Sequence, residues 1–253
     1  MNAEYLNQQN RVSIPEEILQ DTTFEKLYLL VRKSEQRVYS NREILSLPDV
    51  VASHKHYHEW SVRKDSCKRL ITYLKKKNRF LKILEVGCGN GWLSNKLVEI
   101  PQTEVIGLDI NLTELQQAAC VFTNSNLHFL YGDLRNNILQ NMQFDIIIFA
   151  ASIQYFSSLN EIISLALKNL TAGGEIHIID SFLYNKKEVE TVKRKCREYY
   201  KNIGFPEMAD YFFHHLLDET YHFNCTIVHQ RNSFFKKLFL KKNIFPWLCI
   251  RHV

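Results

Sequence analysis

The sequence has 253 residues, of which 45% are hydrophobic, so the chain can bury the core of one large α/β domain. Its net charge is only +5, and no apolar run approaches the roughly 20 residues of a membrane-spanning helix or resembles the core of a signal peptide. Six cysteines lie far apart without a CxxC pair, which argues against a zinc site or a disulfide framework. We therefore expect a cytoplasmic globular protein with free thiols.

Residues 1–80 have helical patterns. Residues 13–16 and 40–43 both match a capping box, and apolar residues recur at helical spacing between Phe24 and Val31. A further helix is predicted from Trp60 to Leu74, where apolar residues mark one face. The first third of the chain is therefore predicted to be a helical segment.

From Leu81 onward, short apolar runs alternate with helical patterns. The runs predict strands at residues 82–86, 104–110, 127–131, 144–150 and 175–180, and helices are predicted at 91–100, 111–122 and 158–170. Several runs are almost entirely apolar, as in strands that are buried on both faces. This alternation predicts a doubly wound, mostly parallel α/β sheet with its ligand at the carboxyl ends of the strands.

After Asp180 the pattern is less regular. Residues 187–202 predict a helix, and residues 205–223 contain too many aromatic side chains for a simple linker. Residues 224–230 and 245–253 could form two final strands that close the sheet in antiparallel fashion, with a helix-containing insertion between them.

A loop with alternate glycines, GCGNGW, follows the strand predicted at 82–86. A dinucleotide loop has the spacing G-x-G-x-x-G, but Trp92 occupies the position of the third glycine after Gly87 and Gly89. A nucleoside triphosphate loop needs a lysine followed by a hydroxyl residue, and no such pair follows here. The spacing therefore counts against a nucleoside triphosphate and against an NAD-dependent oxidoreductase, which we keep as an alternative.

Carboxylates lie at the ends of three successive predicted strands. Glu85 can accept hydrogen bonds from an ammonium group, and the helix that follows offers free N–H groups to a carboxylate. Asp109 can accept from both hydroxyls of a ribose, and Asp133 can accept from an exocyclic amine such as that of adenine. An amino acid, a ribose and an adenine together describe S-adenosylmethionine (SAM).

The motifs ILEVGCGNG, VIGLDIN, LYGDL, FDIIIFAASIQYF and LTAGGEIHI resemble the successive motifs of the class I SAM-dependent methyltransferases, over about residues 81–180. The resemblance implies a Rossmann-like domain at 81–253 with an aromatic insertion near 205–223, an active site covered by the helical segment 1–80, and S-adenosylhomocysteine (SAH) as product. It assigns Glu85, Gly87, Cys88, Gly89 and Gly91 to the methionine pocket, Asp109 and Ile110 to the ribose, Asp133 and Leu134 to the adenine, and Ala150 and Gln154 to the methyl-donor cleft.

The loop SIQYF resembles the branch that acts on small molecules, the type 11-like methyltransferases. We therefore expect methylation of O or N on a small-molecule or lipid-linked metabolite. Displacement at a sulfonium needs alignment more than a named catalytic residue, so the catalytic residue stays open. Tyr155 and His214 are the candidates, and Asp180, Ser181 and His215 are further acceptor-side groups.

Other interpretations remain. Basic runs at residues 75–79, 193–195 and 236–242 suggest an RNA methyltransferase, and the lack of a certain catalytic residue leaves a SAM-binding module without turnover. Residues 234–247 mix aromatic residues with lysines, so peripheral membrane contact is a further alternative to core packing. His54, His56 and His58 alternate without a fourth ligand nearby, so no metal is predicted. The sequence leaves the oligomeric state open.

Overall fold

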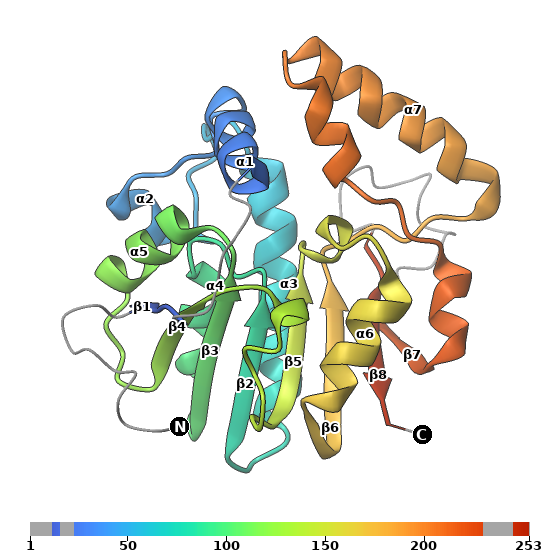
Figure 1. Ribbon diagram of the computed structural model, residues 1–253. Coiled ribbons are helices and arrows are strands. Elements are labelled where there is room, and N and C mark those ends of the chain that lie inside the picture. The colour runs from blue at the N-terminus through green and yellow to red at the C-terminus, as the bar shows by residue number, and fades with distance from the viewer. Residues whose placement is uncertain (1–11, 16–22, 230–244, 253) are drawn as a thin grey trace.

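The computed structural model describes residues 12–15, 23–229 and 245–252. Within these ranges, eight strands form one sheet in the order β1-β4-β3-β2-β5-β6-β8-β7 (Figure 1). The strands are β1 (Val12–Ser13), β2 (Leu81–Val86), β3 (Thr103–Asp109), β4 (Leu127–Tyr131), β5 (Phe144–Ala150), β6 (Leu170–Ile179), β7 (Asn224–His229) and β8 (Trp247–Arg251). Strands β1 to β6 pair in parallel, whereas β8 is antiparallel to both β6 and β7. The predicted fold class is confirmed.

Helices cover both faces of the sheet. They are α1 (Thr23–Ser34), α2 (Asn41–Ser46), α3 (Tyr57–Lys75), α4 (Trp92–Val98), α5 (Leu112–Val121), α6 (Leu159–Lys168) and α7 (Lys186–Asn202), with 3-10 turns η2 (Leu134–Asn136), η3 (Ile153–Tyr155), η4 (Pro206–Tyr211) and η5 (Leu217–His222). Successive strand side chains point to opposite faces. Ile83 accordingly packs in the core under α3, α4 and α5, and Leu84 packs in the core under α6.

Strand β2 lies between β3 and β5. The chain runs from β2 outward to β3 and β4, and then returns to β5 on the other side of β2. The loops that follow β2 and β5 therefore lead to opposite sides, which opens a crevice at the carboxyl ends of these strands.

The N-terminal segment contains a strand as well as helices. Val12 and Ser13 pair in parallel with Phe129 and Leu130 of β4, although residues 1–80 were expected to be helical. A two-residue edge strand is too short to give a period-2 pattern in the sequence. The capping box at Ser40 is confirmed, whereas the box predicted at 13–16 extends to a residue outside the described ranges.

The C-terminal part follows the prediction where it is described. The helix predicted at 187–202 is α7, and the aromatic stretch at 205–223 contains η4 and η5. Most of the aromatic and lysine-rich segment at 234–247, with the basic run 236–242, lies outside the described residues. Among the described helices, none has the length and apolarity needed to cross a membrane.

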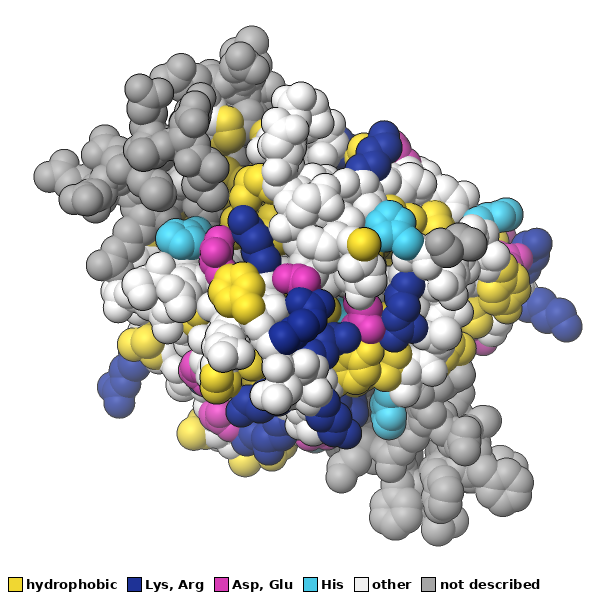
Figure 2. Space-filling view, turned by 90° about the horizontal axis from the view of Figure 1, so that it is seen from below, with side chains coloured by type: hydrophobic (Ala, Val, Ile, Leu, Met, Phe, Trp, Pro, Cys, Tyr) yellow, Lys and Arg dark blue, Asp and Glu magenta, His cyan; other side chains and the backbone are white. Residues whose placement is uncertain are grey.

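The face at the amino ends of the strands carries part of the basic charge noted in the sequence. Figure 2 shows lysine and arginine side chains interspersed with acidic ones on this face. Arg79 donates to Asp145 at 2.6 Å, and Glu175 accepts from Lys77 and from Arg251, each at 2.8 Å. These ion pairs partly neutralise the basic run, and they lie at the opposite end of the strands from the crevice.

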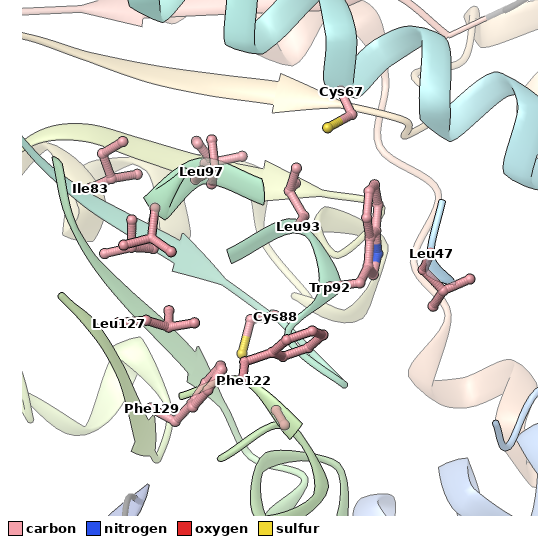
Figure 3. Close-up of a cluster of buried hydrophobic side chains, with 14 of the residues drawn as sticks. Leu47, Cys67, Ile83, Cys88, Trp92, Leu93, Leu97, Phe122, Leu127 and Phe129 are labelled. Carbon is pink, nitrogen blue, oxygen red and sulfur yellow. The ribbon is translucent and has the colours of Figure 1, made fainter. Parts of the chain in front are cut away.

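The glycine loop leads into α4, which begins in the core. Figure 3 shows Trp92 and Leu93 in the same cluster as Phe129 and Cys67. The ring of Trp92 also meets Trp60 of α3 edge to face, with centroids 5.4 Å apart. Gly91 has φ +72°, and a Cβ there would lie 2.7 Å from the ring of Phe129. Only glycine satisfies both the backbone angle and the close contact.

Replacing Gly91 by alanine should therefore destabilise the protein in two ways. The positive φ costs about 1–2 kcal/mol for any L-residue, and overpacking against Phe129 adds about 1–3 kcal/mol. Gly173→Ala is the matched control, because Gly173 has φ +77° but a Cβ there would meet no heavy atom of the described residues within 4 Å. Urea unfolding should show a larger decrease in the free energy of unfolding for Gly91→Ala than for Gly173→Ala. Equal decreases would refute the packing argument.

Candidate functional site

A cavity of about 550 Å³ lies at the carboxyl ends of β2 to β5, a volume typical of small-molecule sites. Residues predicted from the sequence that line it are Gly87, Gly89, Asp109, Ile110, Asp133 and Leu134. Those predicted but found outside the lining are Glu85, Cys88, Gly91, Ala150 and Gln154. The structure thus brings together the loop after β2 and the ends of the next two strands.

The glycine loop forms the floor of the cavity. Gly87 has φ +75°, and a Cβ on it would lie 2.5 Å from the Cβ of Ser152. The Ser152 hydroxyl in turn donates to the Val86 carbonyl at 2.6 Å, which links the end of β2 to the turn after β5. The backbone of the loop is therefore held close to β5, and at Gly87 and Gly89 it lines the cavity without a side chain.

Asp109 ties the loop to the next helix. Its two carboxylate oxygens accept from the backbone N–H groups of Gly89 at 2.7 Å and Asn111 at 2.8 Å. Burial raises the pKa of Asp109 to about 6. Asn111 also lines the cavity and caps α5, but its buried Nδ2 has no hydrogen-bond partner among the described residues. Such an orphaned donor costs free energy unless a ligand accepts from it.

Asp133 is paired with Arg135, a residue that the sequence motifs did not single out. Its carboxylate accepts from Nε of Arg135 at 3.0 Å and from Nη2 at 2.5 Å. Asp133 Oδ1 also accepts the backbone N–H of Arg135 at 2.8 Å and so caps η2. Both side chains line the cavity, and the guanidinium carbon lies 5.9 Å from the ring centroid of Phe156. In the sequence, the one indication of this pair is that Arg135 follows Asp133 by two residues.

Glu85 lies behind the loop and not in the cavity wall. It is 2% exposed and accepts a hydrogen bond from the Ser94 hydroxyl at 2.5 Å. Burial raises the pKa of Glu85 to about 8, and the nearby Asp109 charge adds to this shift. A carboxyl group in this environment holds its proton near neutral pH when no cation is close.

A second wall of the cavity comes from outside the sheet. It includes Phe24, Glu25 and Tyr28 from α1, together with Asp210 and Tyr211 from η4. Glu25 Oε1 accepts the backbone N–H of Leu112 at 3.0 Å, which fixes α1 to the start of α5. The helical repeat from Phe24 to Val31 predicted the helix, but no local signal placed it over the strand ends.

The two candidate catalytic residues differ in position. Tyr155 lines the cavity, and burial raises its pKa, so it stays protonated at neutral pH. His214 lies outside the lining, where its ring packs against Tyr184 and Phe212. The geometry therefore puts a protonated Tyr155 in the cavity wall and leaves His214 out of it.

The other acceptor-side groups are also outside the cavity lining. Asp180 accepts from the Ser66 hydroxyl of α3 at 2.6 Å, and burial raises its pKa to about 6. Ser181 donates to the Ile179 carbonyl at 3.3 Å. His215 is buried, and its Nε2 lies 3.1 Å from the Ile153 carbonyl. These contacts give all three groups a structural role.

Among the described residues, one group could hold a metal by distance alone. Glu175, His177 and Cys249 have ligand atoms within 4.8 Å of one another. However, Glu175 already contacts Lys77 and Arg251, and the Trp247 indole N–H donates to His177 Nδ1 at 3.1 Å. The charges favour an ion-pair network over a cation site, and the absence of a metal stays a prediction.

Solved structures share this fold. The magnesium protoporphyrin IX methyltransferase of Synechocystis PCC 6803 with bound SAH has a TM-score of 0.60 at 16% identity, covering 92% of this chain and 100% of that chain. A plantazolicin methyltransferase in complex with SAH has a TM-score of 0.54 at 16% identity, covering 91% and 96%. At such identities these likenesses establish the fold alone.

Sequence comparisons establish the family. Malonyl-[acyl-carrier protein] O-methyltransferases of Priestia megaterium and Acetivibrio thermocellus are each 29% identical over 118 and 124 residues, which is 46% of this chain and 43% of theirs. The matches thus span less than half of these relatives. A family model described as a methyltransferase domain matches residues 77–240. The chain therefore belongs to the methyltransferase-domain family and has the fold of the class I SAM-dependent methyltransferases, whose cofactor is SAM.

Proposed function

We propose that this protein transfers the methyl group of SAM to O or N of a small-molecule, lipid-linked or carrier-linked metabolite. The observation that carries the proposal is the cavity at the point where the strand order reverses, because Gly87, Gly89, Asp109 and Asp133 meet there. The likeness to two malonyl-[acyl-carrier protein] O-methyltransferases supports a small or carrier-linked acceptor. The basic run at 75–79 lies at the other end of the sheet, which does not favour RNA.

The lining suits the parts of SAM in chain order. The bare backbone at Gly87 and Gly89 leaves room for the methionine chain, and Asp109 accepts from the ribose hydroxyls. The orphaned Asn111 Nδ2 can donate to an oxygen of the same ligand. Asp133, oriented by Arg135, faces the adenine end. We place Cys88, Gly91, Ala150 and Gln154 around this ligand as supports for the lining residues.

Bound SAM supplies a methyl group that is already activated by its sulfonium. The chain therefore has to align the acceptor and exclude water. Tyr155 and the rings of the second wall enclose the cavity, and the Tyr155 hydroxyl can donate to the acceptor. A SAM-binding module without turnover is distinguished from an enzyme by label transfer from methyl-labelled SAM into extract fractions.

Asp109→Ala should weaken SAM binding by about 1–3 kcal/mol, the scale for lost hydrogen bonds to a charged group. Calorimetric titration of the purified protein with SAM, SAH and NAD measures this loss and tests the cofactor itself. Glu104→Ala, at the start of the same strand and away from the cavity, is the control and should bind SAM as the wild type does. Unchanged SAM affinity in a folded Asp109→Ala variant would exclude the ribose assignment.

We also assign Glu85 to the methionine end of SAM, where the positive charge of the SAM ammonium, acting across the glycine loop, favours the carboxylate form of Glu85. In the cofactor-free protein, Glu85 keeps its proton up to about pH 8, whereas the unfolded chain releases it near pH 4.5. The folded state thus binds more protons between these values, so the free energy of unfolding falls as pH rises, by at most about 1.4 kcal/mol per unit.

Glu85→Gln should remove this part of the pH dependence while still accepting from Ser94. Urea unfolding of both proteins at pH 5, 6, 7 and 8 gives the difference. Glu104→Gln removes a partly exposed carboxylate, and its free energy of unfolding should depend on pH as that of the wild type does. Parallel slopes for wild type and Glu85→Gln would show that Glu85 is ionised throughout.

A further inference from the structure

The second wall of the cavity differs in chemistry from the wall formed by the strand ends. We call it the acceptor wall and define it as Phe24, Glu25, Tyr28, Tyr155, Asp210 and Tyr211. It lines the same cavity as the groups that the proposed function assigns to SAM, and it adjoins them where Glu25 accepts the Leu112 N–H at the start of α5. Because an acceptor has to bind in the same cavity as SAM, we use the chemistry of this wall to infer which acceptor can bind.

Aromatic rings make up most of the acceptor wall. The ring of Phe24 lies 5.2 Å from that of Tyr211 and 5.7 Å from that of Tyr155, measured between centroids. Tyr28 meets Tyr155 edge to face at 5.7 Å. Aromatic faces carry partial negative charge and attract ammonium groups, the more strongly when water is excluded.

The charged side chains of the acceptor wall are both acidic. Glu25 is held at the wall by its hydrogen bond to the Leu112 N–H, and Asp210 is an exposed residue that lines the cavity. Among the described residues that line the cavity, Arg135 is the one with a cationic side chain, and Asp133 binds it in bidentate fashion. A carboxylate acceptor would thus find no unpaired cation among the described lining residues. Arg32 lies outside the lining, with its guanidinium carbon 5.7 Å from the centroid of the Tyr28 ring.

From these observations we propose that the acceptor is an amine, bound at the acceptor wall as a cation and methylated on nitrogen. This proposal rests on the proposed function and adds the acceptor atom to it. The amine first loses one proton, which Asp210 can pass to solvent. The nitrogen lone pair then forms the N–CH₃ bond while the C–S bond breaks and leaves its electron pair on sulfur. Each turnover thus yields the methylated ammonium, SAH and one proton.

Binding of matched probes to the SAH-saturated protein tests the wall directly. The probes are 2-phenylethylammonium, 2-phenylethanol and 3-phenylpropionate, which share one apolar frame and differ in charge. Calorimetric titration should show the ammonium binding about tenfold or more tightly than the other two. Equal or tighter binding of the alcohol or the acid, or no binding of the ammonium, would overturn the proposal.

Variants identify the side chains responsible. Asp210→Asn and Glu25→Gln should each weaken ammonium binding by about 3- to 10-fold, and Glu25→Gln can still accept the Leu112 N–H. Glu207→Gln is the matched control, because Glu207 is an exposed acid of the same turn η4 but lies outside the cavity lining. Tyr211→Leu should weaken binding, whereas Tyr211→Phe should retain it. If Glu207→Gln weakens ammonium binding as much as Asp210→Asn does, the effect comes from the overall surface charge, and the proposed site is overturned.

Methyl transfer separates this proposal from the proposed function. Extracts are divided by ion exchange, incubated with the full chain and methyl-labelled SAM, and then treated with mild alkali. Label in the cationic fraction that resists alkali supports an N-methylated amine. Label that appears in the anionic fraction and is released by alkali as methanol indicates a methyl ester. That result would support the methyltransferase function but would overturn the proposal of an amine acceptor. If SAH fails to bind at all, the proposed function fails, whatever the probes show.

Discussion

The close contact between the glycine loop and the end of β5 determines where the cavity lies. Gly87 approaches Ser152 so closely that no side chain fits between them, and the Ser152 hydroxyl bonds the last residue of β2. Asp109 then holds the same loop from the other side through the Gly89 N–H. These contacts hold the loop backbone at the cavity without intervening side chains and position the strand ends around the cavity. The remaining features of the site depend on that arrangement.

Desolvation is the electrostatic consequence of this arrangement. Glu85, Asp109 and Glu114 lie close to one another near the loop, and burial raises the pKa values of all three, to about 8, 6 and 7. Without a ligand, the protein therefore contains three poorly solvated acidic groups whose pKa values lie near neutral pH. A cationic ligand relieves this cost, which agrees with a cofactor that carries a sulfonium and an ammonium group.

The two walls of the cavity come from different parts of the chain and serve different purposes. The strand ends follow the family motifs and carry the groups that we assign to the cofactor, whereas α1 and η4 lie outside these motifs and carry the groups that we assign to the acceptor. The hydrogen bond from Leu112 to Glu25 joins the walls at one point. A common fold can carry different functional sites, so the acceptor has to be inferred from the residues outside the family motifs.

The sequence by itself determined the longer strands, the burial of several of them on both faces and the cofactor motif, because these depend on local periodicity and on glycine spacing. Gly87, Gly89, Asp109 and Asp133 were all predicted from it, and all line the cavity. Only the tertiary structure decided that Glu85 lies behind the loop, that Arg135 pairs with Asp133, and that Val12 and Ser13 extend the sheet. It alone also placed Phe24 and Tyr211 together. These features depend on contacts between residues far apart in the chain or on ring and charge geometry, which no local pattern encodes.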